Sequence, residues 1–363
     1  MKLQTWKIQG RGAFHFGEHG IGHEESRVTW PSDSLFAALV IRLAALYGPE
    51  AVENWLGTPQ APRTPPFLVT STFPYAGEVR FFPVPKAALR PPKQTQTAPA
   101  LRPKDLKKVR FVSEGIYRLL IQGHSLLSVW ETHRLLRIHH ETVWLLPAEE
   151  GGLPISPKQR RQNCHPETLK FWSAEKRPRV AVGRALHNSN LFHIGAVHFA
   201  KGCGLWFGVQ WLSDDPQQHA LLQDLLTDLG DTGLGAERTS GYGAATITPW
   251  HDLDLPTPED GAMWTTLSRY LPRADEIPAL RDPAAAYEVE RLGGWLDGYS
   301  LRRRAINLLR EGAVLGPLDQ PLPYGQLVDL KPVPGPEDTF QPPAHPVWRS
   351  GLAVAVGYQR GEA

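Results

Sequence analysis

The stretch that most constrains this sequence is a glycine-rich segment at 233–243, Gly-Leu-Gly-Ala-Glu-Arg-Thr-Ser-Gly-Tyr-Gly. It follows an expected helix at 217–229 and precedes an expected strand at 244–248. Dinucleotide-binding and P-loop fingerprints need the opposite order, with a strand before the glycines and a helix after them. Glycine permits positive φ and close backbone approach, and successive N–H groups can form a concave phosphate site. The segment is therefore either a tight connection, the commoner case, or a loop that binds a polyanion.

Positive charge is concentrated in two segments, although the whole chain carries only +2. Segment 86–110 holds eight Lys or Arg against one acid, and segment 158–184 holds eight against two. A local basic face on a nearly neutral protein is typical of binding to a phosphate backbone. A solvated loop rich in Lys and Arg fits the charge equally well. Residues 85–104 are also rich in proline and glutamine, which predicts an extended or mobile arm with little to bury.

Composition excludes several classes of protein. A chain of 363 residues with 41% hydrophobic and 21% charged residues indicates about two ordinary globular domains. No window approaches the apolar length of a membrane span, and the first residues lack the apolar run of a signal peptide. Cys164 and Cys203 cannot form a disulfide framework, so a cytoplasmic location is expected. His15, His19 and His23 recur every fourth residue, but intervening glycines break a helix there, so no zinc site and no cofactor are expected.

The hydrophobic periodicity predicts alternating strands and helices on either side of a long insertion. A helix is expected from Ser32, the N-cap, with Asp33 in its first turn, and another after Asp215. Without the insertion, the order is that of the βαββαβ ferredoxin-like fold, whose sheet face commonly binds RNA. The expected strands lie at 3–9, 67–73, 78–84, 191–200, 205–212 and 244–250.

The insertion and the last hundred residues have weaker patterns. Within the insertion, 106–112 is expected as a strand and 115–129 as a helix. The end of the chain is expected to be mainly β, as a distorted second ferredoxin-like domain. Its strand candidates are 264–270, 287–292, 300–308, 325–331 and 351–358.

Four motifs carry a resemblance to a known family. They are Phe-His-Phe-Gly-Glu at 14–18 with Gly-Ile-Gly at 20–22, Pro-Ser-Asp-Ser-Leu-Phe at 31–36, the segment 233–243, and His-Pro-Val-Trp-Arg-Ser-Gly at 345–351. Together they resemble CRISPR-associated RAMP proteins, above all the fourth subunit of the Csm (type III-A) effector complex. The motifs span nearly the whole chain in the family's order. The long proline-rich insertion departs from the family, so its contacts do not transfer, and a subunit from another type III branch would look similar.

The resemblance implies an α+β protein with two ferredoxin-like (RRM-like) domains, at 1–250 and 251–363, and a basic thumb inserted at about 85–184. Such a subunit is non-catalytic, grips the repeat-derived 5′ tag of CRISPR RNA (crRNA), and contacts the large polymerase-like subunit and a backbone RAMP subunit. Arg238 would offer a fork to phosphate and Tyr242 a stacking surface. The implied RNA-binding residues are His15, Phe16, Gly17, Ser32, Lys86, Lys104, Lys107, Lys108, Arg110, Arg179, Arg184, Gly235, Arg238, Thr239, Ser240, Gly241, Tyr242 and Gly243.

Two other functions remain open. A RAMP-class endoribonuclease could use His15 as the general base toward a 2′-hydroxyl, but such nucleases resemble one another in a glycine loop near the C-terminus, and here 120 residues follow Gly243. Backbone RAMP subunits cut RNA with an aspartate and a divalent metal, although the place of Asp33 in a first helical turn favours a structural role. A protein-interaction subunit could instead turn its basic face to an acidic partner. Steep salt dependence would indicate phosphate binding.

Overall fold

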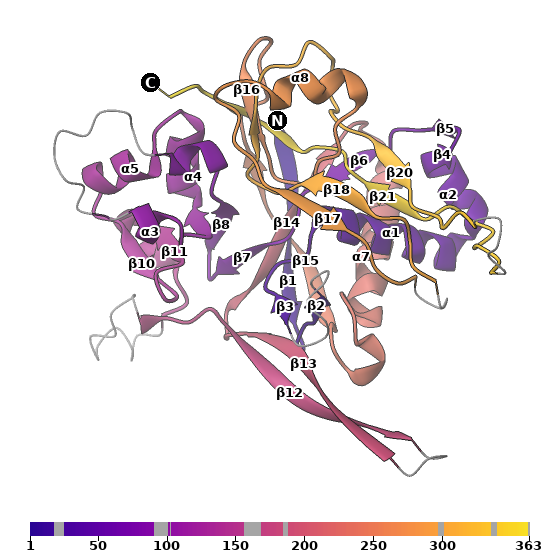
Figure 1. Ribbon diagram of the computed structural model, residues 1–363. Coiled ribbons are helices and arrows are strands. Elements are labelled where there is room, and N and C mark those ends of the chain that lie inside the picture. The colour runs from indigo at the N-terminus through magenta and orange to yellow at the C-terminus, as the bar shows by residue number, and fades with distance from the viewer. Residues whose placement is uncertain are drawn as a thin grey trace.

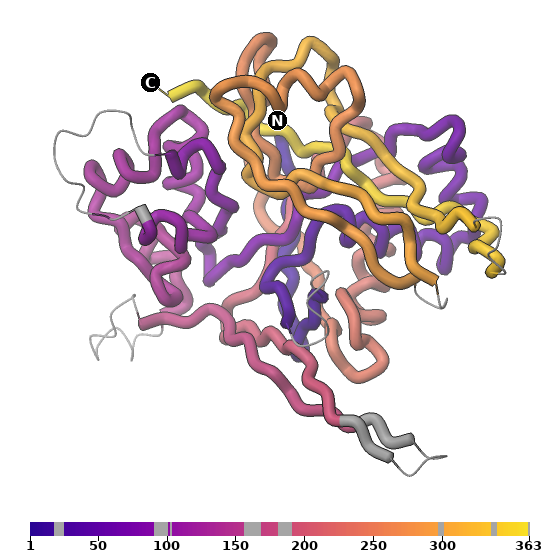
Figure 2. Tube along the Cα trace, viewed as in Figure 1, coloured from indigo at the N-terminus to yellow at the C-terminus, as the bar shows by residue number. Residues whose placement is uncertain are grey.

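The computed structural model describes residues 1–17, 25–90, 101, 103–155, 168–183, 188–296, 301–334 and 340–361. The protein is a mixed α/β structure built on one large sheet (Figure 1). A compact module packs at one edge of this sheet, the C-terminal part lies across the rest of it, and a long β-hairpin projects away from the body (Figure 2). Arg184 and the Gly-Ile-Gly motif at 20–22 fall outside the described residues.

Strand β1 (Lys2–Gly10) lies near one edge of the sheet, between β14 (Cys203–Trp211) and the edge strand β15 (Ala245–Asp254), and is antiparallel to both. Strands β6 (Phe67–Val69) and β7 (Phe73–Ala76) both pair with β14. Two long helices follow β1 and β14 in the sequence. They are α1 (Ser32–Tyr47), which comes after β1, and α7 (Pro216–Thr232), which connects β14 to β15.

Both helices pack on one face of the sheet because the periodicities of helix and strand bring apolar residues together there. Trp6 and Ile8 of β1 and Phe207 of β14 meet leucines of α1 and α7 in a single core cluster. Each fully buried side chain of this size contributes about 1.5–3 kcal/mol. Helix α1 begins at Ser32 with Pro31 as its N-cap. The expected N-cap is therefore one residue late, and Gly48 then leads directly into a second helix, α2 (Pro49–Leu56).

The module extends the central sheet through β8, β9, β11 and β10, and its buried residues share one core cluster with residues of the sheet and of the C-terminal part. Of the strand expected at 106–112, only Phe111 and Val112 are extended, because α3 ends at Leu106 and a turn follows it. The helix expected at 115–129 is broken at Gly123, whose φ of 91° is outside the helical range. The elements of the module are β8 (Val79–Pro83), η1 (Lys86–Leu89), α3 (Pro103–Leu106), β9 (Phe111–Ser113), α4 (Glu114–Ile121), α5 (Leu126–Thr132), β10 (Leu136–Ile138), β11 (Val143–Leu145) and η2 (Pro147–Gly152).

The projecting hairpin is formed by β12 (Trp172–Gly183) and β13 (Asn188–Phe199), paired over their whole lengths. The sequence pattern predicts β13 but not β12. A two-stranded ribbon has solvent on both sides, so the side chains at 173–178 are exposed and show no apolar alternation. Pro178 inside the run further weakens the strand signal.

The C-terminal part is β-rich with short strands around a small aromatic core, Trp264, Tyr270 and Tyr324. Each of the five expected strands overlaps a shorter one, and β19 and β21 are additional to them. No helix among the described residues is long and apolar enough to cross a membrane. The elements of the C-terminal part are β16 (Met263–Thr266), η5 (Ala274–Glu276), α8 (Ile277–Leu280), β17 (Val289–Leu292), β18 (Ile306–Leu309), β19 (Val314–Leu315), β20 (Leu327–Asp329), β21 (Trp348–Ser350) and β22 (Ala355–Tyr358).

Two minor ribbons nearer the start of the chain pair β2 (Phe16–Gly17) with β3 (Ser26–Arg27) and β4 (Gly57–Thr58) with β5 (Ala61–Pro62).

Candidate nucleic-acid interface

The glycine loop, residues 233–243, is a compact turn between α7 and β15. Its four glycines all have φ between 84° and 91°, and Glu237 is left-handed as well, at 61°. A 3₁₀ turn, η4 (Arg238–Ser240), forms the tip. The Leu234 N–H donates to the Gly243 carbonyl at 2.9 Å and closes the base of the loop. The loop therefore has a defined shape that only glycine permits at several positions.

Two of the glycines are explained by packing against the body. A Cβ on Gly243 would lie 2.2 Å from the Leu234 carbonyl oxygen, and a Cβ on Gly235 would lie 2.5 Å from that of His15. Gly241 differs, since a Cβ there would meet no described atom within 4 Å. The loop thus has a packed base and an open tip, where another molecule can approach the backbone.

Segment 13–17 lies between the glycine loop and the hairpin. The Gly243 N–H donates to the Ala13 carbonyl at 2.8 Å. On the other side, Phe14 and Val197 of β13 exchange two backbone hydrogen bonds of 2.9 Å. The structure therefore brings together the glycine loop, the motif at 14–17 and the root of the projecting hairpin, which are far apart in the sequence.

The side chains of His15 and Phe16 face inward. Each is 2% exposed, and His15 Nδ1 lies 2.8 Å from the Gly195 carbonyl oxygen. Phe16 stacks between Phe14 and Trp30, with ring centroids 5.2 and 5.7 Å apart. These two residues therefore shape the site from beneath, and Gly17 is the exposed member of the motif.

Tyr242 is also buried, at 5% exposed, where the sequence predicts an open stacking surface. It packs against Ala13 and against Ile194 and Ala196 of β13. The Arg179 guanidinium lies 5.6 Å from the centroid of its ring. The ring is thus covered by the hairpin, while Thr239, Ser240 and Gly241 at the loop tip are exposed.

The hairpin adds basic residues that the sequence analysis does not single out. Lys176 and Arg177 are exposed on β12, two or three positions from Arg179. Arg177 Nη2 lies 2.7 Å from Glu175 and 2.8 Å from His198 Nε2. The run Lys-Arg-Pro-Arg at 176–179 is the signal that could have found them.

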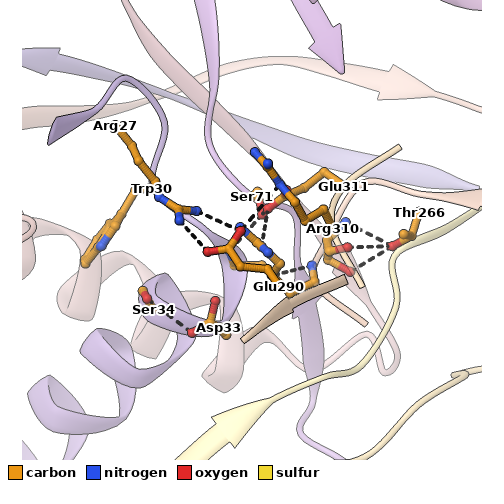
Figure 3. Close-up of polar contacts among 12 residues, drawn as sticks. Arg27, Trp30, Asp33, Ser34, Ser71, Thr266, Glu290, Arg310 and Glu311 are labelled. Carbon is orange, nitrogen blue, oxygen red and sulfur yellow. Dashed lines mark hydrogen bonds and ion pairs between the residues drawn. The ribbon is translucent and has the colours of Figure 1, made fainter. Parts of the chain in front are cut away.

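Ser32 and Asp33 lie at a buried junction with the C-terminal part. Ser32 is 3% exposed; its N–H donates to Ser71 Oγ, and its hydroxyl accepts from the Arg269 N–H, both at 2.8 Å. Asp33 is buried beside Ser34 (Figure 3), and Arg349 Nε lies 3.7 Å from its carboxylate. The C-terminal part therefore covers this end of α1, which corrects the expectation that Ser32 meets phosphate. Among the described residues, no group of three or more His, Cys, Asp or Glu could hold a metal ion.

The remaining expected basic residues lie on or beside the module. Lys86 Nζ pairs with Glu288 of the C-terminal part at 2.8 Å. Lys108 pairs with Asp105 at 3.2 Å and lies 3.7 Å from Glu141. Lys104, Lys107 and Arg110 are exposed. These residues lie on η1, on α3 and in the turn between α3 and β9, which are different elements from the glycine loop.

Comparisons with known proteins agree with the motifs. Residues 259–358 match the family model described as the CRISPR Csm4 C-terminal domain. A curated Csm4 protein of Mycobacterium tuberculosis is 24% identical over 306 residues, which cover 83% of this chain and 84% of that protein. The Csm4 protein of Methanocaldococcus jannaschii is 22% identical over 350 residues, covering 87% and 86%.

The fold is shared with solved structures as well. A chain in the crystal structure of a Csm3-Csm4 subcomplex of the type III-A interference complex aligns with a TM-score of 0.65 at 17% identity, covering 99% of this chain and all of that one. A chain of a Csm1-Csm4 cassette aligns with a TM-score of 0.55 at 16% identity, and both chains are covered completely. The chain is thus similar in sequence to curated Csm4 proteins, matches the Csm4 C-terminal domain model over residues 259–358, and shares its fold with chains in solved Csm4 complexes of type III-A systems.

Proposed function

We propose that this chain is a non-catalytic RNA-binding subunit of a type III CRISPR effector complex. It binds the repeat-derived 5′ tag of crRNA and joins the large polymerase-like subunit to the backbone subunits. The observation that carries the proposal is the meeting of the glycine loop, segment 13–17 and the basic hairpin at one place. Similar chains occur in a Csm3-Csm4 subcomplex and in Csm1-Csm4 cassettes, which supports these two kinds of partner.

The proposed architecture is a ferredoxin-like domain at 1–250 with an insertion at about 85–184, followed by a second domain at 251–363. In its support, β1 lies between β14 and β15, and β6 and β7 pair with β14. This is the antiparallel order of a βαββαβ unit with α1 and α7 on one face. The family match at 259–358 supports a separate C-terminal unit. The hairpin β12–β13 takes the role of the thumb.

RNA would lie over the loop tip and along the hairpin. Gly241 leaves room for a backbone, and the hydroxyls of Thr239 and Ser240 are exposed beside it. The guanidinium groups of Arg238 and Arg179 can each donate paired hydrogen bonds to phosphate oxygens. Because Tyr242 is covered by the hairpin, its part in the proposal is to seat Arg179 at the loop.

The nuclease alternative has less support. A general base must reach the proton it removes, within about 3.2 Å or through one water. The His15 ring is 2% exposed and its Nδ1 lies beside the Gly195 carbonyl. Asp33 is buried beside Arg349. Specific cleavage of repeat RNA that is lost in His15→Ala, or magnesium-dependent cleavage lost in Asp33→Ala, would establish an enzyme instead.

The proposal is tested by titrating labelled tag RNA and a shuffled RNA with the native complex and with the double variant Arg179→Ala/Arg238→Ala. If both arginines contact phosphate, the double variant binds tag RNA more weakly than the wild type. The magnitude of its slope of log K against log salt is also smaller by about two. Arg42→Ala is the matched control, because Arg42 pairs with Asp228 across α1 and α7 on the helical face. Unchanged tag affinity in the double variant would refute this RNA site.

A further inference from the structure

Arg27, on the short strand β3, is held by a carboxylate from the C-terminal part. Its Nη1 donates to Glu290 Oε2 at 3.1 Å, and its Nη2 donates to the other oxygen of the same carboxylate. The two side chains are only 13% and 19% exposed. A bidentate contact of this kind fixes the relative orientation of the two side chains as well as their distance. The pair therefore ties β3 to β17 in one orientation.

Glu290 is itself held from several sides (Figure 3). Arg269 Nη2 donates to Glu290 Oε2 at 2.8 Å, and Arg269 Nε donates to Glu311 at 3.0 Å. The Ser71 hydroxyl donates to Glu311 in turn. Arg310 Nε lies 3.4 Å from Glu290 on the more exposed side of the cluster. The Glu290 carboxylate is thus a fixed point to which Arg27 can be anchored.

Arg27 is connected to the candidate interface through the β2–β3 ribbon. It pairs with Phe16 in the β2–β3 ribbon, and the Phe16 N–H donates to Ser26 Oγ at 2.9 Å. The Phe16 ring closely approaches Gly235 of the glycine loop, where an added Cβ would lie 2.9 Å from a ring carbon. A continuous path of contacts therefore runs from Glu290 through Arg27 and Phe16 to the glycine loop.

We infer that Glu290 is a positioning residue for RNA binding, and that the C-terminal part sets the geometry of the glycine loop through Arg27. The inference rests on the proposed function. Glu290 and Arg27 hold the ribbon beneath the loop, and neither contacts RNA. Because coupling between two sites is reciprocal, RNA bound at the loop also strengthens the attachment of β17 to β3.

The test compares Arg27→Ala with Arg27→Lys and with Arg310→Ala. Arg310 is the matched control, since it contacts the same carboxylate and is further from β3. Tag RNA affinity is expected to fall about fivefold or more in Arg27→Ala, to recover in part in Arg27→Lys, and to stay near the wild-type value in Arg310→Ala. The salt slope of Arg27→Ala stays that of the wild type, because no phosphate contact is lost.

Three results would overturn the inference: unchanged affinity in Arg27→Ala, an equal loss in Arg310→Ala, or a salt slope reduced by about one, the mark of a direct phosphate contact. Thermal unfolding of each variant checks folding, and Glu290→Gln replaces Arg27→Ala if the latter does not fold. Hydrogen exchange without RNA separates the inference from the proposed function. Amides of 13–17 should exchange faster in Arg27→Ala than in Arg310→Ala, even if wild-type protein failed to bind tag RNA; equal exchange contradicts the inference.

Discussion

At the scale of single residues, the glycines of the loop have different tasks. Gly243 and Gly241 share nearly the same φ, 84° and 85°. Only Gly243 is also enclosed, because an added Cβ would lie 2.2 Å from the Leu234 carbonyl oxygen and 2.8 Å from its nitrogen. The base of the loop is thus fixed by backbone contact, and the tip is free to meet a ligand.

This difference predicts unequal effects of the same substitution. Gly243→Ala and Gly241→Ala both introduce a left-handed alanine, which costs about 1–2 kcal/mol. Gly243→Ala must in addition displace backbone, so its melting temperature should fall several degrees further than that of Gly241→Ala. Thermal unfolding of the two variants measures this. Equal melting temperatures would show that the loop base can relax around a Cβ.

The sequence predicts a binding site at the glycine loop but cannot show which of the predicted side chains are accessible. Tyr242 is an aromatic between glycines, the pattern of a stacking residue, yet β13 covers it. His15 and Ser32 are polar residues near glycines or at a helix start, and both prove to be buried. Their burial depends on contacts with residues some 180 and 237 positions away in the chain, which no local pattern contains.

At the scale of elements, the hairpin is fixed at its root by His139 of the module. Its Nδ1 accepts from the Phe171 N–H at 3.2 Å, and its ring centroid lies 3.7 Å from that of Trp172. Residues 139–141 all have positive φ, between 48° and 64°, although none is glycine. Such backbone persists only where surrounding contacts determine it. The root of the hairpin is therefore a fixed joint between module and hairpin.

This joint should weaken in acid. Burial first, and then the nearby charges of His140, Lys170 and Arg110, lower the pKa of His139 to about 4 from its ordinary 6.5. Between these values the unfolded chain binds a proton that the folded protein does not, so stability falls as pH drops from about 6.5 to about 4. Melting temperatures across this range should show a smaller fall in His139→Asn than in wild type. Parallel curves would mean that His139 does not titrate in this way.

The sequence predicts β13 and β14 well because each has an apolar face against the body. It misses β12, whose exposed residues 173–178 carry charge without alternation. Within the module it misplaces elements, since only the last two residues of the strand expected at 106–112 are extended and the helix expected at 115–129 is interrupted at Gly123. The module buries Tyr117 and Leu120 of α4 together with Trp144 of β11, two elements that are separate in the sequence. A core assembled from short, distant pieces leaves little periodicity in any one of them.

At the scale of the whole molecule, the N- and C-terminal parts are joined by the ion cluster around Glu290 (Figure 3). Burial alone would raise the pKa of Glu290, but hydrogen bonds and charge from Arg27 and Arg269 outweigh it and lower the pKa to about 2. Removing one partner from such a cluster leaves charge without compensation, which is more costly than the cluster's net contribution.

The lowered pKa of Glu290 predicts a second loss of stability in acid, over a different pH range from that of His139. The stabilisation from Glu290 is complete above its ordinary pKa of 4.5 and is lost as pH falls from there toward about 2. Glu290→Gln should therefore be clearly less stable than wild type at about pH 6 and should approach it as pH falls below about 4. Thermal unfolding of both proteins checks this. A difference independent of pH would show that Glu290 acts through shape alone.

The most direct test of RNA binding at the loop is to map where tag RNA touches the chain in the native complex, by photo-crosslinking and mass spectrometry. We expect crosslinks at the tip of the glycine loop, residues 238–241, and along the described part of β12, and we expect them to decrease in Arg179→Ala/Arg238→Ala. Crosslinks confined to the helical face of α1 and α7, or unaffected by that double substitution, would contradict the account.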